Sequence, residues 1–290
     1  MIRNRMLIAV LALVLAGCST IQLRQAQDSY ADAVQIESRI RNASDSGDSF
    51  MDLTAAQISY KKALADLDKV LAEKSGDLRA NKLLGTARVM RALILWRITA
   101  LDFHELSGIC QKGAGGEVVD EPKDEMRKQW YGDLRSIGSD LDDKKIFLGT
   151  RDLTVYEALY ALYAFDILKR INYKSTKLDV QCSIDWFNQS MSHFQKAAAI
   201  PGPDHDIQKW LALSNLTVQA DYSARLSESV GIDQLLHAGY NPKASVLKAV
   251  CPAQDFWDDG EDEKDRAFLK QLREKAKGVG VVLTPETACP

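Results

Sequence analysis

Apolar side chains recur every three or four positions along most of the chain, which is the spacing of one face of an α-helix. The clearest segment runs through Leu53, Ala56, Ala63, Leu67 and Val70. Similar segments follow, separated by short polar or glycine-containing breaks. On this pattern we expect helices over residues 20–43, 53–74, 77–106, 122–137, 152–168, 183–199, 206–229, 233–238, 242–250 and 264–277.

Residues typical of helix ends support several of these boundaries. Gly76 follows the second predicted helix, and Asp77 is a plausible cap for the third. Residues 107–121 contain four glycines and predict a loop, after which Asp120 is a candidate cap and Pro122 lies in the first turn of a helix. Residues 279–283 predict either a short strand or an extended strip that covers the core.

Successive amphipathic helices with short turns predict an all-α fold of stacked antiparallel helical hairpins. Over residues 53–90 the chain resembles the tetratricopeptide repeat, with a turn at Ser75-Gly76-Asp77 and a Leu84-Gly85 pair on the facing helix. A looser match is carried by Phe194, Ala197, Pro203, Trp210 and Leu213. The resemblance implies an irregular, tetratricopeptide-like array that exposes a concave surface.

The first residues have the pattern of an exported protein. Arg3 and Arg5 precede an apolar run that ends at Gly17, which is too short for a membrane-spanning helix. The closing sequence Leu15-Ala16-Gly17-Cys18 resembles bacterial lipoprotein precursors, and this resemblance implies cleavage before Cys18 and attachment of palmitate-type acyl chains to it. Ser19, rather than Asp, implies the outer membrane of a Gram-negative bacterium, facing the periplasm.

This pattern divides the chain into four segments. Residues 1–17 are the predicted signal peptide, and 18–52 form an N-terminal helix and linker. Residues 53–250 form the helical-hairpin domain, and 251–290 a C-terminal helix with a disulfide-tied tail.

Charge and composition exclude one class of partner. The chain has 290 residues, 46% of them apolar and 27% charged. Without residues 1–17 it has 35 Lys and Arg against 40 Asp and Glu, a net charge of −5. Nucleic-acid binding draws most of its affinity from basic side chains on phosphates, so this balance predicts no nucleic-acid partner.

Four cysteines besides Cys18 fall in the exported part. Cys110, Cys182, Cys251 and Cys289 allow three pairings, and an oxidising periplasm favours disulfides. We favour Cys110–Cys182, which would hold the glycine-rich loop, and Cys251–Cys289, which would close the tail. Their spacing is too long for a zinc site.

Searches for catalytic or metal-binding motifs find none complete. His104-Glu105 begins an HExxH motif, but Gly108 stands where the second histidine is required. Residues 255–263 are acidic and indicate either an exposed helix N-terminus or a weak, irregular calcium site. Asp140, Asp142 and Asp143 indicate a solvated helix end. The sequence therefore predicts no catalytic residue, no metal and no cofactor.

Three tyrosines one helical turn apart give the remaining candidate site. Tyr156, Tyr160 and Tyr163 lie on one side of a helix that is apolar around most of its circumference. They indicate either core packing or the lining of a groove for a ligand or partner.

The predicted location and the predicted fold together predict the function. A membrane-tethered helical array suits an adaptor or scaffold that binds another cell-envelope protein. The alternative is a lipoprotein that binds a small apolar ligand, because the layout also resembles the helical-repeat lipoproteins associated with TRAP-type transporters.

Overall fold

A computed structural model describes residues 21–37, 49–102, 106, 108–120, 122–202, 205–254 and 263–284. Within these ranges the regular structure is helical, and β-pairing is limited to isolated bridges around residues 109–119 and 178. The predicted all-α fold is confirmed. Cys18, Cys289, the signal peptide and the acidic residues 255–262 lie outside the described ranges. None of the described helices is long and apolar enough to cross a membrane.

The chain forms two compact units whose boundary falls inside one helix. The first unit comprises residues 1–103 and 124–159, and the second comprises residues 104–123 and 160–290. The first holds the helix over residues 21–37, α2 (Ser49–Ala80), α3 (Leu84–Ala100), α4 (Glu125–Asp142) and the start of α5 (Thr150–Arg170). The second holds the end of α5, α6 (Val180–Ala199), α7 (His205–Val230), α8 (Ile232–His237), α9 (Pro242–Gln254) and α10 (Glu263–Gly278).

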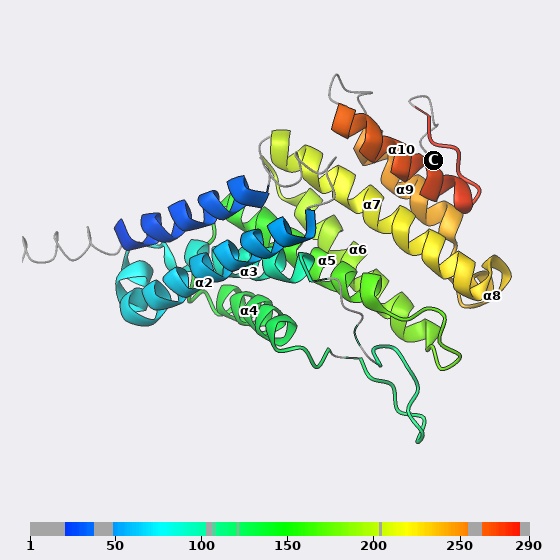
Figure 1. Ribbon diagram of the computed structural model, residues 1–290, viewed down its shortest axis with the longest axis horizontal. Coiled ribbons are helices and arrows are strands. Elements are labelled where there is room, and N and C mark those ends of the chain that lie inside the picture. Colours follow the sequence, from blue (N-terminus) through cyan, green and yellow to red (C-terminus); the bar gives the residue numbers. More distant parts are fainter. Residues whose placement is uncertain are drawn as a thin grey trace, which may run out of the picture. The chain divides into compact units, whose positions relative to one another are not determined.

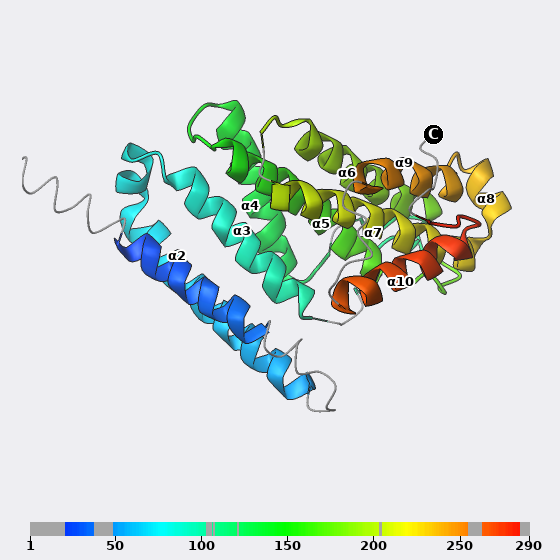
Figure 2. The same ribbon diagram turned by 90° about the horizontal axis from the view of Figure 1, so that it is seen from above.

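In the first unit, residues 21–37 run antiparallel to α2, and α3 packs against both α2 and α4 (Figures 1 and 2). Fully buried alanines, such as Ala26 and Ala33, allow the close approach of the first two helices. A partly buried ion pair joins Glu37 to Arg97, and the Tyr60 hydroxyl donates to the same carboxylate at 2.7 Å. These hydrogen bonds offset the cost of burying Glu37.

The turn between α2 and α3 lies beyond the predicted place. α2 continues through Gly76 and ends at Ala80, after which Lys82 takes a left-handed conformation (φ 59°). The Leu83 amide donates to the Leu78 carbonyl at 2.7 Å, which is the bond of a Schellman motif. Leu78 is fully buried, so continuing the helix past Gly76 gains apolar burial. The predicted end at residues 74–76 is therefore wrong, and the tetratricopeptide register that depended on it is not confirmed.

A close approach at Gly85 joins the loop between α4 and α5 to the start of α3. A Cβ atom at this position would lie 2.3 Å from the Phe147 carbonyl oxygen and 2.7 Å from a Leu148 methyl carbon. Only glycine leaves room for this contact. The tetratricopeptide resemblance placed Gly85 at a contact between two helices, whereas the atoms nearest to its Cβ position belong to this loop.

Three helix starts differ from the predicted ones. Asp77, the predicted cap of the third helix, lies inside α2, and α3 begins after Leu83. α4 begins after Asp124, whose carboxylate accepts a hydrogen bond from the Arg127 amide at 2.9 Å, so the prediction of Asp120 as the cap is wrong. α6 begins after Asp179, three residues before its predicted start, and the Asp179 carboxylate accepts from the Cys182 amide at 2.8 Å.

In the second unit, α7 packs against α6, α9 and α10 (Figure 1). The core between α7, α9 and α10 includes Leu216, Val246 and Leu272, each at most 2% exposed. Residues 281–284 follow the turn at the end of α10 as a strip without regular structure, in which Val281 is 2% exposed and Val282 is 73% exposed. Of the two predicted alternatives for this tail, the strip that covers the core is the one found.

The predicted disulfide between Cys110 and Cys182 is present, with the two Cα atoms 5.4 Å apart. It joins the loop over residues 108–120 to the first turn of α6, beside a backbone bond from the Asp179 amide to the Cys110 carbonyl at 2.7 Å. Cys251 also takes part in a disulfide, but Cys289 lies outside the described residues, so the pairing of these two stays a prediction.

Candidate functional site

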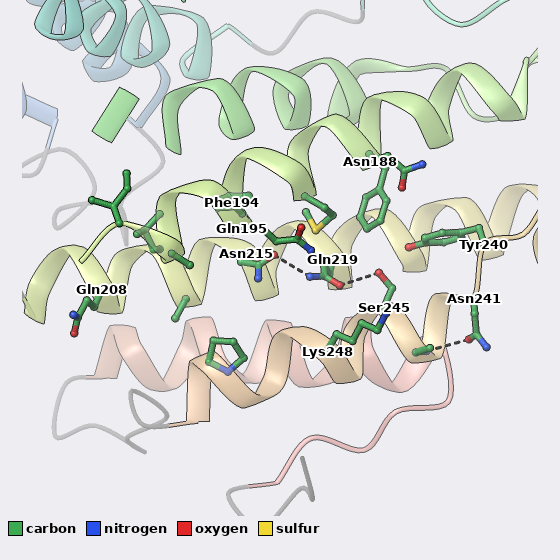
Figure 3. Close-up of a pocket in the computed structure, with 18 of the residues that line it drawn as sticks. Asn188, Phe194, Gln195, Gln208, Asn215, Gln219, Tyr240, Asn241, Ser245 and Lys248 are labelled. Atoms are coloured by element: carbon green, nitrogen blue, oxygen red, sulfur yellow. Dashed lines mark hydrogen bonds between the residues drawn. The ribbon is translucent and has the colours of Figure 1, made fainter. Parts of the chain in front are cut away.

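The second unit contains a pocket of about 850 Å³ between α6, α7 and α9 (Figure 3). Apolar side chains from all three helices form part of its wall. Its lining includes Phe187, Met191, Phe194, Ala198, Ile200, Leu211, Ala212, Ala244 and Pro252. On α6 these apolar positions follow helical spacing, so the face that builds the pocket was visible in the sequence pattern.

The polar part of the wall consists mainly of carboxamides. Six asparagine and glutamine side chains line the pocket, namely Asn188, Gln195, Gln208, Asn215, Gln219 and Asn241. Lys248 is the one cation and no carboxylate occurs among the described lining residues. The pocket therefore presents neutral groups that can both donate and accept hydrogen bonds.

Gln219 organises this wall (Figure 3). It is 6% exposed and donates through Nε2 to the Asn215 Oδ1 atom at 2.9 Å. Its Oε1 atom accepts a hydrogen bond from the Ser245 hydroxyl at 2.8 Å. The chain of bonds links α7 to α9 and fixes the orientation of both amides. Because the Asn215 oxygen is held by Gln219, the Asn215 amino group is left to face other partners.

Tyr240 and Phe187 form an aromatic floor. The Phe187 ring stacks on Tyr222 with ring centroids 4.5 Å apart, and Tyr240 meets Phe187 edge-on at 5.2 Å. Gly239, with φ 80°, allows the reversal after α8 that brings Tyr240 here, and the Tyr240 amide closes the turn on the Leu235 carbonyl at 2.9 Å.

The Tyr240 hydroxyl is held in the protein interior. Tyr240 is 6% exposed, and its hydroxyl lies 2.7 Å from the Ser223 hydroxyl. Burial raises the pKa of Tyr240 to about 12, although the bonds to Ser223 and Ser245 act in the opposite direction. The phenol is therefore neutral at physiological pH and supports the wall without contributing charge.

The three tyrosines singled out in the sequence lie away from this pocket. Tyr156 is 6% exposed, and its hydroxyl donates to the Leu134 carbonyl at 3.2 Å in the first unit. Tyr163 is fully buried against Trp186 in the second unit, and Tyr160 stacks on His193 with centroids 4.0 Å apart. None of the three lines the pocket. Two of them pack in the core, because α5 is apolar on most of its circumference.

The sequence does hold a signal for the pocket, although no catalytic or metal-binding motif contains it. Gln208, Asn215 and Gln219 follow one another at intervals of seven and four residues on α7, and Asn188 and Gln195 are seven apart on α6. Carboxamides at helical spacing on two successive helices are therefore placed to face a shared groove.

A metal site is the other type of site to consider in the described part of the chain. No group of three or more His, Cys, Asp and Glu side chains there could hold a metal ion. Asp140, part of a predicted acidic helix end, pairs with Arg88 and lies 3.8 Å from Lys145, whereas Asp143 lies 2.6 Å from Lys145. These carboxylates are engaged in ion pairs within the first unit.

The pocket thus consists of an apolar floor, a wall of carboxamides and one lysine. Comparisons of the chain with models of protein families, with curated proteins and with solved structures give no match.

Proposed function

We propose that this protein is a lipid-anchored periplasmic adaptor that binds an extended peptide segment of another cell-envelope protein. The segment binds in the pocket between α6, α7 and α9, which we call the carboxamide pocket. The observation that carries the proposal is the composition of the wall, with six carboxamides and no carboxylate among its described residues. The anchor is the acyl group proposed at Cys18, from the Leu15-Ala-Gly-Cys18 sequence.

A carboxamide side chain offers the same pair of groups as a peptide bond. It donates through its amino group and accepts through its carbonyl oxygen, so it can bond a backbone N–H or C=O of any residue type. An extended peptide exposes these groups along its edge. Affinity then comes from backbone bonds, and specificity comes from side chains that enter the apolar floor.

The dimensions suit a short peptide. Asn188 and Gln195 are seven residues apart on α6, which is about 10 Å along the helix, and Gln208 and Gln219 are about 16 Å apart on α7. Because a strand rises about 3.3 Å per residue, the pocket matches roughly three to five extended residues. Lys248 favours a segment that carries a carboxylate.

The volume also favours a second candidate, a small apolar ligand. About 850 Å³ falls within the range of roughly 300–1,000 Å³ typical of small-molecule sites, and Phe187, Phe194 and Leu211 supply an apolar surface. Six carboxamides exceed what such a ligand needs, because each polar group that a ligand leaves unpaired costs binding energy.

Peptide display on the purified chain without its signal peptide tests the proposal. We expect enrichment of short peptides that bind through the pocket. Replacing Gln195 or Asn188 by Ala should weaken them by roughly tenfold, whereas Gln234→Ala, an exposed change on α8 outside the lining, should not. The proposal fails if no peptide depends on the pocket. A small molecule retained in native mass spectrometry, and lost in the Gln195 variant, would instead establish the second candidate.

A further inference from the structure

Two turns of the first unit bring four basic side chains together. Arg79 and Lys82, at the end of α2, and Lys144 and Lys145, after α4, line a cavity of about 210 Å³. Phe147 lines it too and is 61% exposed. We call these five residues the basic turn surface. The contact of Gly85 with the Phe147 carbonyl holds the two turns together.

Most of this positive charge is not neutralised within the described part of the chain. Arg79, Lys82 and Lys144 are exposed there and form no ion pair with another described residue, whereas Lys145 is paired with Asp143. No carboxylate occurs among the described residues that line the cavity. The surface is therefore net positive.

The backbone of the surface is itself unusual. Lys82 (φ 59°) and Lys144 (φ 55°) both adopt the left-handed conformation that glycine or asparagine favours at the end of a helix. Each closes a Schellman turn, since the Lys144 amide donates to the Leu141 carbonyl at 3.0 Å as the Lys82 amide does to that of Arg79. Lysine is less favourable than glycine in this conformation. At both positions, however, its positive charge lies near a helix C-terminus, where it interacts favourably with the helix dipole.

The helix over residues 21–37 begins at the same end of the unit. Its antiparallel contacts with α2 pair Ser29 with Asp66 and Glu37 with Tyr60, so its start lies beyond Asp66 toward Ala80. Figures 1 and 2 show this start and the turn between α2 and α3 at one end. Cys18 precedes Ile21 by three positions, so their Cα atoms are at most about 11 Å apart.

We infer that the basic turn surface lies on an anionic lipid bilayer, with Arg79, Lys82 and Lys144 at the headgroup phosphates and Phe147 inserted between lipids. A cluster of cations beside an exposed aromatic ring is the composition that binds such an interface. The inference rests on the proposed anchor at Cys18, because that anchor would direct this end of the unit toward the membrane.

The test uses the chain without its acyl group, so that its outcome does not depend on acylation. A Cys18→Ser chain without residues 1–17 is mixed with vesicles of phosphatidylcholine and phosphatidylglycerol, and its partition is measured by sedimentation. Each basic residue near an anionic surface contributes roughly fivefold in affinity. We expect binding that salt abolishes and that vesicles of phosphatidylcholine alone do not support.

Two matched triple variants make the test specific. Arg79→Gln, Lys82→Asn and Lys144→Asn together should lower the partition at least tenfold without lowering the unfolding temperature, because Asn suits a left-handed position. Lys61→Gln, Lys62→Gln and Lys69→Gln remove the same charge from exposed positions of α2 and should retain most of the binding. Phe147→Ala should weaken the binding that remains at moderate salt.

Three results would overturn the inference: equal partition of the two triple variants, binding independent of phosphatidylglycerol, or displacement of the protein from vesicles by glycerol 3-phosphate. The last would indicate a site for a soluble phosphate. If the unchanged protein is not labelled with palmitate at Cys18 but the chain still binds vesicles, only the proposed anchor is contradicted.

Discussion

Tyr240 shows how single side chains shape the candidate site. Its ring supports the pocket floor, and its hydroxyl bonds Ser223 in the interior. The sequence could not indicate this role. Tyr240 lies in the turn before α9, and the apolar pattern of that helix does not show which side chain of the turn reaches the pocket. The tyrosines that the sequence did single out, on α5, are distinguished by spacing and are placed mainly by core packing.

The raised pKa of Tyr240 predicts a measurable dependence of stability on pH. Above pH 10.0, the usual phenol pKa, the unfolded chain loses this proton, whereas the folded chain keeps it until about pH 12. The free energy of unfolding therefore falls as pH rises through this window, by about 1.4 kcal/mol per pH unit for this one group.

Urea unfolding at pH 8 and at pH 11 measures this fall. Tyr240→Phe should reduce the slope by about one proton, while costing about 1 kcal/mol at pH 8 through loss of the bond to Ser223. An unchanged slope in the variant would show that the phenol ionises as readily in the folded protein as in the unfolded chain.

Helices were predictable from the sequence, whereas their ends were less so. The period of apolar residues indicated each described helix, because burial of one face decides helix formation. Ends depend on competition between nearby signals: Gly76 was available as a terminator, yet burial of Leu78 extended α2 to Ala80. In the same way, Asp120 was the predicted cap of α4, but in the folded chain Asp124 caps this helix.

Two helical glycines should respond to alanine in opposite directions. Gly132, in the middle of α4, has no atom within 4 Å of the place that a Cβ would occupy, so Gly132→Ala should stabilise the protein by about 0.5–1 kcal/mol through helix propensity. Gly85→Ala should destabilise it by about 1–3 kcal/mol, because the new Cβ meets the Phe147 carbonyl. Thermal unfolding of both variants tests the contact. If Gly85→Ala also stabilises, the loop between α4 and α5 is not packed on α3.

The disulfide between Cys110 and Cys182 should account for a large part of the stability of the second unit. The two cysteines are 72 residues apart in sequence, and closing a loop of this length restricts the unfolded chain by about 4 kcal/mol. The double variant Cys110→Ser and Cys182→Ser should lose stability of this order in urea. Addition of reductant to the unchanged protein should cause at least this loss, because it also reduces the disulfide of Cys251. A loss well below 1 kcal/mol would show that the glycine-rich loop is held by its backbone bonds alone.

At the scale of the whole molecule, the proposed function needs both an anchor on the first unit and a binding pocket in the second. Cys18→Ser should prevent processing and leave a precursor that a fatty-acid analogue does not label. The matched change Cys18→Ala should behave identically, because neither side chain offers a thiol for acylation. Labelling of either variant would show that Cys18 is not the site of the lipid.

Photocrosslinking in cells tests the central claim, peptide binding in the carboxamide pocket, most directly. A photoreactive amino acid is placed at Gln195, which lines the pocket, or at Lys196, an exposed residue next to it that does not. We expect an adduct from position 195 to one short segment of another envelope protein, competed by a peptide selected on the purified chain, and no such adduct from position 196. The same adducts from both positions, or a small molecule alone at position 195, would contradict peptide binding in this pocket.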